Sequence, residues 1–323
     1  MSKDTTALKG LMVMTQNQSV TVSSGVSVTA DSTLSSRYVL LEANSIQNYL
    51  KFQKEFGSLV KQHRSSRKES KSMEWDLGLG WEGHEKMLSE GWPEGIKDLK
   101  LAQANFPNTA SFGKVPDTDI AGGSLCVASY CSGAPDHYDV PPEEDSNADT
   151  KVVKIVVPIG ALQGYDAKKL FNRGAGIVSA INAIERSGKQ CEVWAESTSK
   201  GYGGGMVGQR VLIKWAGAPL DLNNLAVWIG HPATFRRLFF SGRECLWGFT
   251  VDGKSCHEML GGYGGTCQLP VGAGRLKEGT IYMPLAEHGN YRSPRKTMET
   301  LSAIFKSQGF MLNFGNLSQM SDE

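Results

Sequence analysis

The sequence lacks the features of a membrane-spanning or exported protein. Its first apolar run, Leu11–Met14, is much shorter than the core of a signal peptide, and no stretch approaches the ~18 consecutive apolar residues of a membrane helix. Because no export signal is recognisable, we expect the six cysteines to be reduced thiols. These absences predict a soluble protein of a cytoplasm, without a membrane partner.

A large net charge of either sign is also absent. The 34 Lys and Arg residues and the 33 Asp and Glu residues leave a formal charge of +1, which excludes a histone-like polycation. Basic residues can still gather locally, so this balance leaves room for a basic patch on one surface.

Motifs of catalysis and cofactor binding are missing as well. The glycine loops Gly201–Gly205 and Gly261–Gly265 lack the Lys-Ser/Thr pair of a phosphate loop, and no Gly-x-Ser-x-Gly or Cys-His nucleophile signature is present. The spacing of Cys126 and Cys131 does not make a paired zinc knuckle. We therefore predict no catalytic residue, no cofactor and no metal site, and an enzyme with a non-obvious site stays open as a third alternative.

The length of 323 residues suits about two domains, and 40% hydrophobic with 21% charged residues is typical of a globular chain. Shifts in composition divide the chain into four parts. Residues 1–44 form a Ser/Thr-rich tail or a strand pair that turns at Ser24-Gly25, and residues 45–131 form a helical and irregular part rich in Trp and Gly. Residues 132–150 are an acidic linker with prolines, and residues 151–315 form an α/β domain.

The pattern of the last part predicts its class. A near-continuous apolar run over 151–159 is typical of a strand buried on both faces, and a helix with an apolar stripe and a second strand at 191–195 complete a βαβ unit with parallel strands. A helix broken near Gly230-His231-Pro232 and a last helix capped by Ser293 follow. We expect a three-layer α/β fold with a central sheet, Rossmann-like or von Willebrand A-like.

Basic residues beside aromatic rings are the strongest functional signal. Lysine and arginine neutralise phosphates, and flat rings such as Trp75 and Trp81 can stack on bases. The alternatives to nucleic-acid binding are structural: a solvent-exposed connecting segment, tryptophans that anchor loops, and cations that offset helix dipoles. The predicted phosphate contacts form three patches: Lys61, Arg64, Arg67 and Lys68; Arg236, Arg237 and Arg243; Arg292, Arg295 and Lys296.

Several short motifs carry a resemblance to known families. Trp75–Trp81, Asp119–Gly123, Ser132–Asp136 and His231–Leu238 together resemble a family of uncharacterised tailed-phage proteins, which implies a viral origin and a bacterial host cytoplasm but no reaction. The stretch from Asn172 to Trp194 is similar, more weakly, to the first crossover of von Willebrand factor A domains.

Von Willebrand factor A domains bind partners through a metal held by an Asp-x-Ser-x-Ser loop after the first strand. The equivalent stretch here, Pro158–Leu162, has no carboxylate and no hydroxyl. The resemblance therefore implies a scaffold without its metal site.

The leading functional hypothesis is a phage-encoded, non-enzymatic accessory protein that binds nucleic acid, preferably single-stranded DNA, in transcription or replication. A viral or host polymerase subunit is a further expected partner. The alternative is a protein–protein interaction module on a metal-free von Willebrand A-like scaffold.

Overall fold

The structure is a computed structural model of the chain. It describes residues 12–14, 18–31, 37–57, 78–107, 110–114, 117–119, 124–125, 131–132, 138–140, 152–160, 167–202, 204–267, 279–286 and 290–315.

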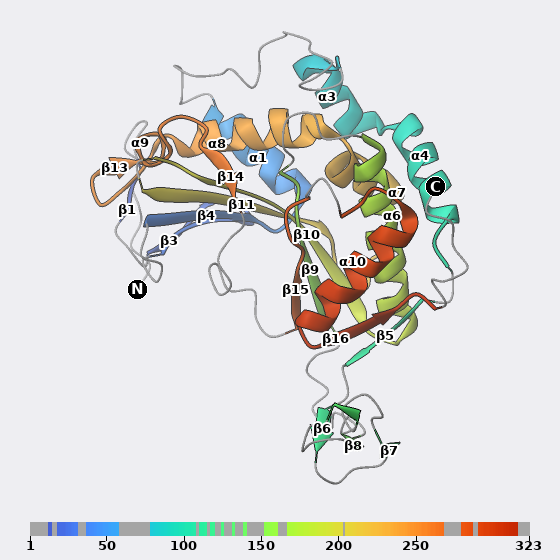
Figure 1. The fold of residues 1–323 in the computed structure, drawn as a ribbon. Coiled ribbons are helices and arrows are strands. Elements are labelled where there is room, and N and C mark those ends of the chain that lie inside the picture. Colours follow the sequence, from blue (N-terminus) through green and yellow to red (C-terminus); the bar gives the residue numbers. More distant parts are fainter. Residues whose placement is uncertain are drawn as a thin grey trace.

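A mixed sheet of eight strands, flanked by helices, forms the centre of the molecule (Figure 1). Its strand order is β15-β9-β10-β11-β4-β3-β2, and β14 pairs with β10. β9 is parallel to β10 and β15, β11 is parallel to β4, and the other pairs are antiparallel. The strands are β2 (Ser19–Ser23), β3 (Val26–Asp31), β4 (Arg37–Ala43), β9 (Val152–Pro158), β10 (Gln190–Lys200), β11 (Gly205–Lys214), β14 (Gly265–Cys267) and β15 (Thr280–Tyr282). This architecture confirms the predicted α/β class and is consistent with a three-layer fold.

The predicted βαβ unit is present as β9, α6 (Ala167–Arg186) and β10. Its helix packs against α10 (Pro294–Ser307), whose N-cap is Ser293, as the sequence predicts. The two helices approach closely at Gly176, where an added Cβ would lie 2.5 Å from a methyl carbon of Leu301. Glycine at this position therefore sets the distance between α6 and α10.

The helix predicted to break near Gly230 is indeed interrupted at His231-Pro232. The chain passes through α7 (Leu222–Leu225) and the π-helical segment η1 (Ala226–Gly230), and continues after the break through the π-helical segment η2 (Thr234–Phe239) into α8 (Phe240–Leu246). Proline cannot donate an amide hydrogen bond, which explains the interruption.

The strand pair predicted within residues 1–44 is β2 and β3, which turn at Ser24-Gly25, where Gly25 has a φ of +68°. β4 follows and pairs with β11, so the N-terminal strands belong to the same sheet as the strands of 151–315. The sheet therefore crosses the predicted boundaries, because parallel pairing joins segments that composition separates.

The remaining elements surround this sheet. Ser45 caps α1, where the amide of Asn48 donates to its hydroxyl at 3.1 Å. β8 lies within the predicted acidic linker and pairs with β6 and β7 in a small sheet apart from the central one (Figure 1). These elements are α1 (Ile46–Gly57), α3 (Gly80–Glu90), α4 (Pro93–Ala104), α9 (Cys256–Leu260), β1 (Met12–Met14), β5 (Ser111–Lys114), β6 (Asp117–Asp119), β7 (Ser124–Leu125), β8 (Tyr138–Val140), β12 (Phe249–Val251), β13 (Lys254–Ser255) and β16 (Phe310–Asn313).

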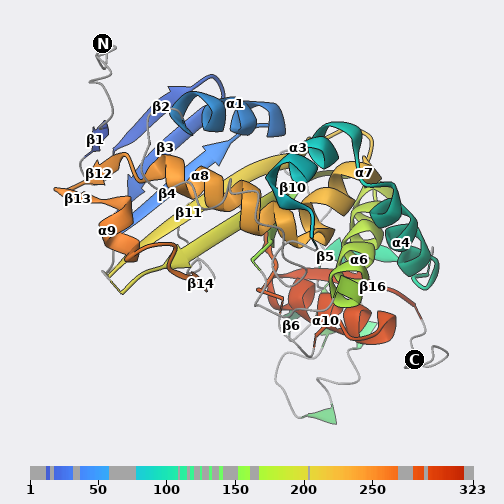
Figure 2. The ribbon, with the colours of Figure 1, turned by 90° about the horizontal axis from the view of Figure 1, so that it is seen from above.

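The two faces of the central sheet differ in chemistry. On one face, alternate residues such as Ile155 and Val193 join Phe52 of α1, Ile181 of α6 and Leu246 of α8 in a single apolar core. Figure 2 shows α1 and α8 lying over the part of the sheet that contains β4 and β11. The other face carries polar residues, and it is described below. None of the helices in the described ranges has the length and hydropathy needed to cross a membrane.

Candidate functional site

The second predicted basic patch is buried. Arg236, Arg237 and Arg243 are 5%, 1% and 0% exposed. Arg243 donates to the carbonyl oxygen of Tyr263 at 2.8 Å and to the hydroxyl of Ser197 at 3.1 Å, and burial lowers its pKa to about 10. The prediction that these three arginines contact phosphates is therefore corrected: a buried guanidinium cannot meet a phosphate at the surface, and Arg243 links α8 to β10.

The third patch lies at the start of α10, where Arg292 precedes the N-cap Ser293 and Arg295 and Lys296 lie on the first turn. Arg292 is exposed, while Arg295 and Lys296 each lie 3.3 Å from the carboxylate of Glu299. Hydrogen bonding from Lys296 lowers the pKa of Glu299. Both views show α10 well away from α8 (Figures 1 and 2), so the structure does not bring the second and third patches into one groove.

The first patch, made of Lys61, Arg64, Arg67 and Lys68, lies outside the described residues, as does Trp75. Trp81 is half-buried on α3 and presents its ring at an edge-on angle to His84, 6.4 Å between centroids. Its position on a packed helix favours the anchoring interpretation for this tryptophan over stacking on a base.

Two motifs that lie far apart in the sequence meet in the structure. Nε2 of His84 lies 3.4 Å from the hydroxyl of Thr234, which itself donates to the carbonyl of Val227 at 2.6 Å. Trp92 packs edge-on against His231, with ring centroids 4.5 Å apart. The Trp/Gly-rich region thus holds α3 and α4 against the broken helix, which is a structural role.

The carboxyl ends of β9 and β15 are the position where α/β sheets commonly bind ligands. Here the buried guanidinium of Arg173 donates to the carbonyl oxygens of Pro158 at 2.7 Å and Pro284 at 3.0 Å. A fixed positive charge disfavours a metal cation at this position. Within the described ranges, no group of three His, Cys, Asp or Glu side chains is placed to hold a metal ion.

A row of polar side chains crosses five strands on the second face of the sheet. Thr21 of β2 is paired with Ser27 of β3, which is paired with Glu42 of β4. Glu42 is paired with Arg210 of β11, which in turn is paired with Glu196 of β10. Since directly paired residues point to the same face, this register places the five side chains side by side.

Three of these side chains form a buried ionic network. Arg210 donates to the Oε2 atom of Glu196 from Nε at 3.1 Å and from Nη2 at 2.7 Å, and its Nη1 lies 3.4 Å from Oε1 of Glu42. The side chains of Arg210 and Glu196 are 0% and 3% exposed, whereas that of Glu42 is 32% exposed. Burial raises the pKa of Glu196, and the charge of Arg210 acts in the opposite direction. With both carboxylates ionised, one positive charge faces two negative charges.

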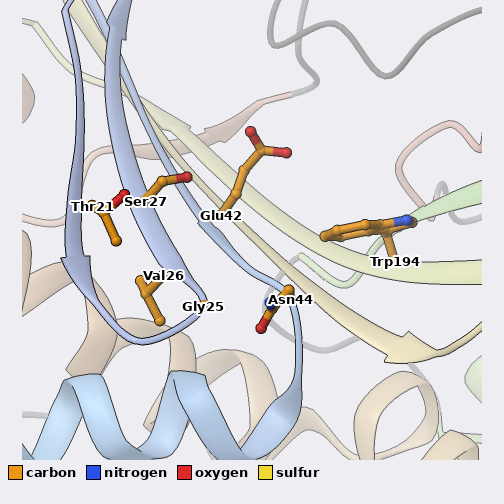
Figure 3. A pocket seen from close by; sticks show the side chains of 7 residues that line it. All are labelled: Thr21, Gly25, Val26, Ser27, Glu42, Asn44 and Trp194. Atoms are coloured by element: carbon orange, nitrogen blue, oxygen red, sulfur yellow. The ribbon is translucent and has the colours of Figure 1, made fainter. Parts of the chain in front are cut away.

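An open hollow of about 350 Å³ adjoins this network (Figure 3). Glu42 and Trp194 stand around it, and Trp194 is 9% exposed because Val156 and Leu212 pack against it. The indole Nε1 donates to Oε2 of Glu192 at 3.4 Å. The lining residues are Thr21, Gly25, Val26, Ser27, Glu42, Asn44 and Trp194.

The hollow combines polar and aromatic groups. It offers a carboxylate, hydroxyl groups, an amide and an indole ring. Sequence reasoning missed it because its residues come from β2, β3, β4 and β10. The signal that could have indicated it is the alternation of Trp194, Glu196 and Thr198 with core residues along β10.

These observations define an α/β protein with a polar hollow on one face of its central sheet. The chain belongs to the family described as a domain of unknown function (DUF7192), whose model matches residues 18–310. No curated protein and no solved structure matches the chain.

Proposed function

We propose that this protein is a non-enzymatic protein–protein interaction module that contacts its partner through the hollow on the polar sheet face. The observation that carries the proposal is the hollow itself, in which a partly exposed carboxylate and an indole ring stand beside a buried ionic network. The burial of Arg236, Arg237 and Arg243 also favours this hypothesis over the nucleic-acid hypothesis. The sequence resemblance to tailed-phage proteins supports a phage origin and action in the cytoplasm of a bacterial host.

The test compares two variants with a tryptophan on the same strand and the same face. Ser27→Trp fills the hollow, whereas Thr29→Trp adds the same side chain two residues further along β3, outside the lining. A partner captured by the tagged full chain after nuclease treatment is purified and bound again in isolation. We expect binding to be retained by Thr29→Trp and weakened at least about tenfold by Ser27→Trp, as for loss of a central contact. Equal binding by both variants, or loss of every partner on nuclease treatment, contradicts the proposal.

Nucleic-acid binding is a second candidate function, with single-stranded DNA as ligand and a polymerase subunit as associated partner. The observation that favours it is the cluster of Arg292, Arg295 and Lys296 at the start of α10, in which Arg292 is exposed. The basic run at Lys61–Lys71 would add further contacts. Filter binding over a salt series tests it: Arg292→Ser should weaken binding and reduce the salt slope by about 1, and affinity that is independent of salt contradicts it.

A further inference from the structure

We propose that the hollow binds the guanidinium group of an arginine side chain, held between the carboxylate of Glu42 and the ring of Trp194. The inference rests on the proposed function, because it names the chemistry that the polypeptide partner presents to the polar sheet face.

The charge of the site is the first argument. Nε and Nη2 of Arg210 donate to Glu196 at 3.1 and 2.7 Å, and Nη1 lies 3.4 Å from Glu42. The more deeply buried carboxylate, that of Glu196, therefore accepts most of the hydrogen bonds that Arg210 donates. Among the described residues, Arg210 is the only cation paired with Glu42. The outer carboxylate therefore keeps acceptor capacity toward the hollow, in a partly buried place where a charged hydrogen bond is stronger than in water.

The shape and the polar lining are the second argument. A guanidinium is planar, carries donors only, and both stacks on aromatic rings and pairs with carboxylates. The hollow supplies acceptors that match it, the carboxylate of Glu42 and the hydroxyls of Thr21 and Ser27. Asn44 also lines it, and its Oδ1 accepts from Nδ2 of Asn48 at 2.7 Å. Figure 3 shows Trp194 on one side of this space and Glu42 on another, with Asn44 just after the end of β4, the strand that carries Glu42.

The size of the hollow is the third argument. A volume of about 350 Å³ is near the lower limit of ligand pockets, so it suits one side chain better than a large ligand. An arginine of a partner polypeptide supplies a charged head for Glu42 and an apolar stem that can lie along the ring.

The experiment titrates the full chain, labelled with 5-fluorotryptophan, with N-acetyl-arginine amide and with the neutral isostere N-acetyl-citrulline amide. Fluorine NMR follows the resonance of Trp194, which is assigned by its loss in Trp194→Phe. We expect a saturable shift of this resonance with the arginine amide, and binding at least tenfold weaker with the citrulline amide.

Matched variants locate the interaction. Glu42→Gln should weaken binding of the arginine amide at least tenfold, whereas Glu55→Gln, which removes an exposed carboxylate on α1, should leave it unchanged. Unshifted resonances of the other tryptophans show that each variant is folded. If Glu42→Gln does not fold, Ser27→Trp serves as the second variant, because it should abolish the shift by filling the hollow.

The outcomes separate this inference from the proposed function. Equal, non-saturating shifts with both amides, or a shift that survives in Glu42→Gln, overturn the arginine site even if a partner protein binds. A saturable shift that depends on Glu42 supports the arginine site, and it does so even if capture finds no partner and the proposed function fails.

Discussion

The network of Arg210, Glu196 and Glu42 gives the sharpest test of how the polar sheet face is stabilised. We predict that Glu196→Gln lowers the free energy of unfolding by about 3 kcal/mol, the lower end of the range for breaking a buried ion pair. The loss arises because the change leaves a fully buried guanidinium facing a neutral amide. The loss of stability stays at the lower end because the carboxylate of Glu42, 3.4 Å from Arg210 and 32% exposed, still compensates part of the charge of Arg210.

Urea denaturation followed by far-ultraviolet circular dichroism measures this loss. With a slope of about 3 kcal/mol/M, the midpoint should fall by about 1 M while the slope stays the same. The matched control is Glu299→Gln, which removes a carboxylate from an exposed network on α10 and should cost at most about 0.5 kcal/mol.

A double variant distinguishes a buried charge from lost packing. Replacing both partners, as in Glu196→Leu with Arg210→Met, removes the buried charge as well as its counter-ion and should recover most of the stability. The reasoning is refuted if Glu196→Gln costs no more than Glu299→Gln, or if the double variant is less stable than the single one.

Three further predictions concern other parts of the fold. Gly176→Ala should destabilise the protein by about 1–2 kcal/mol in the same urea assay, because the new methyl group overpacks the contact between α6 and α10, whereas Gly113→Ala meets no atom and should be neutral. Burial raises the pKa of Cys256 to about 12, so iodoacetamide at pH 8 should alkylate the exposed Cys131 in the native protein and Cys256 only after unfolding, as read by peptide mass spectrometry. A hydrogen bond from the backbone of Ser255 lowers the pKa of Glu258. The ionised carboxylate therefore stabilises the fold above the pKa that Glu258 has in the unfolded chain, and this stabilisation is lost as the pH falls through the pKa of the folded protein. Glu258→Gln should therefore cost more stability at pH 7 than at pH 3, and equal losses at the two pH values would contradict this cause.

Local patterns in the sequence predicted several elements of the fold. Hydrophobic periodicity and caps indicated β9, α6 and β10, the helix that begins at Ser293, and the turn at Ser24-Gly25. These features depend on neighbours within a few residues, so a linear pattern contains the information. The break before Pro232 was predictable for the same reason.

Charge was the misleading signal. Arg236, Arg237 and Arg243 read as a surface patch because arginine is rarely buried, yet the structure places them inside. A guanidinium can be buried when carbonyl and hydroxyl oxygens accept its hydrogen bonds, as the contacts of Arg243 with Tyr263 and Ser197 show. Those acceptors lie 20 and 46 residues away, so sequence spacing could not reveal them.

The sequence by itself determined the α/β class and several of its elements, among them β9, α6, β10 and the helix that begins at Ser293, because each follows from the periodicity and caps of one continuous segment. Only the tertiary structure decided which charges are buried and where a site can form. The pairing of β4 with β11 brings Glu42 beside Arg210, and the pairing of β11 with β10 adds Glu196 and places Trp194 nearby. Register between distant strands fixes these neighbours, and register depends on how the whole chain packs rather than on any local pattern.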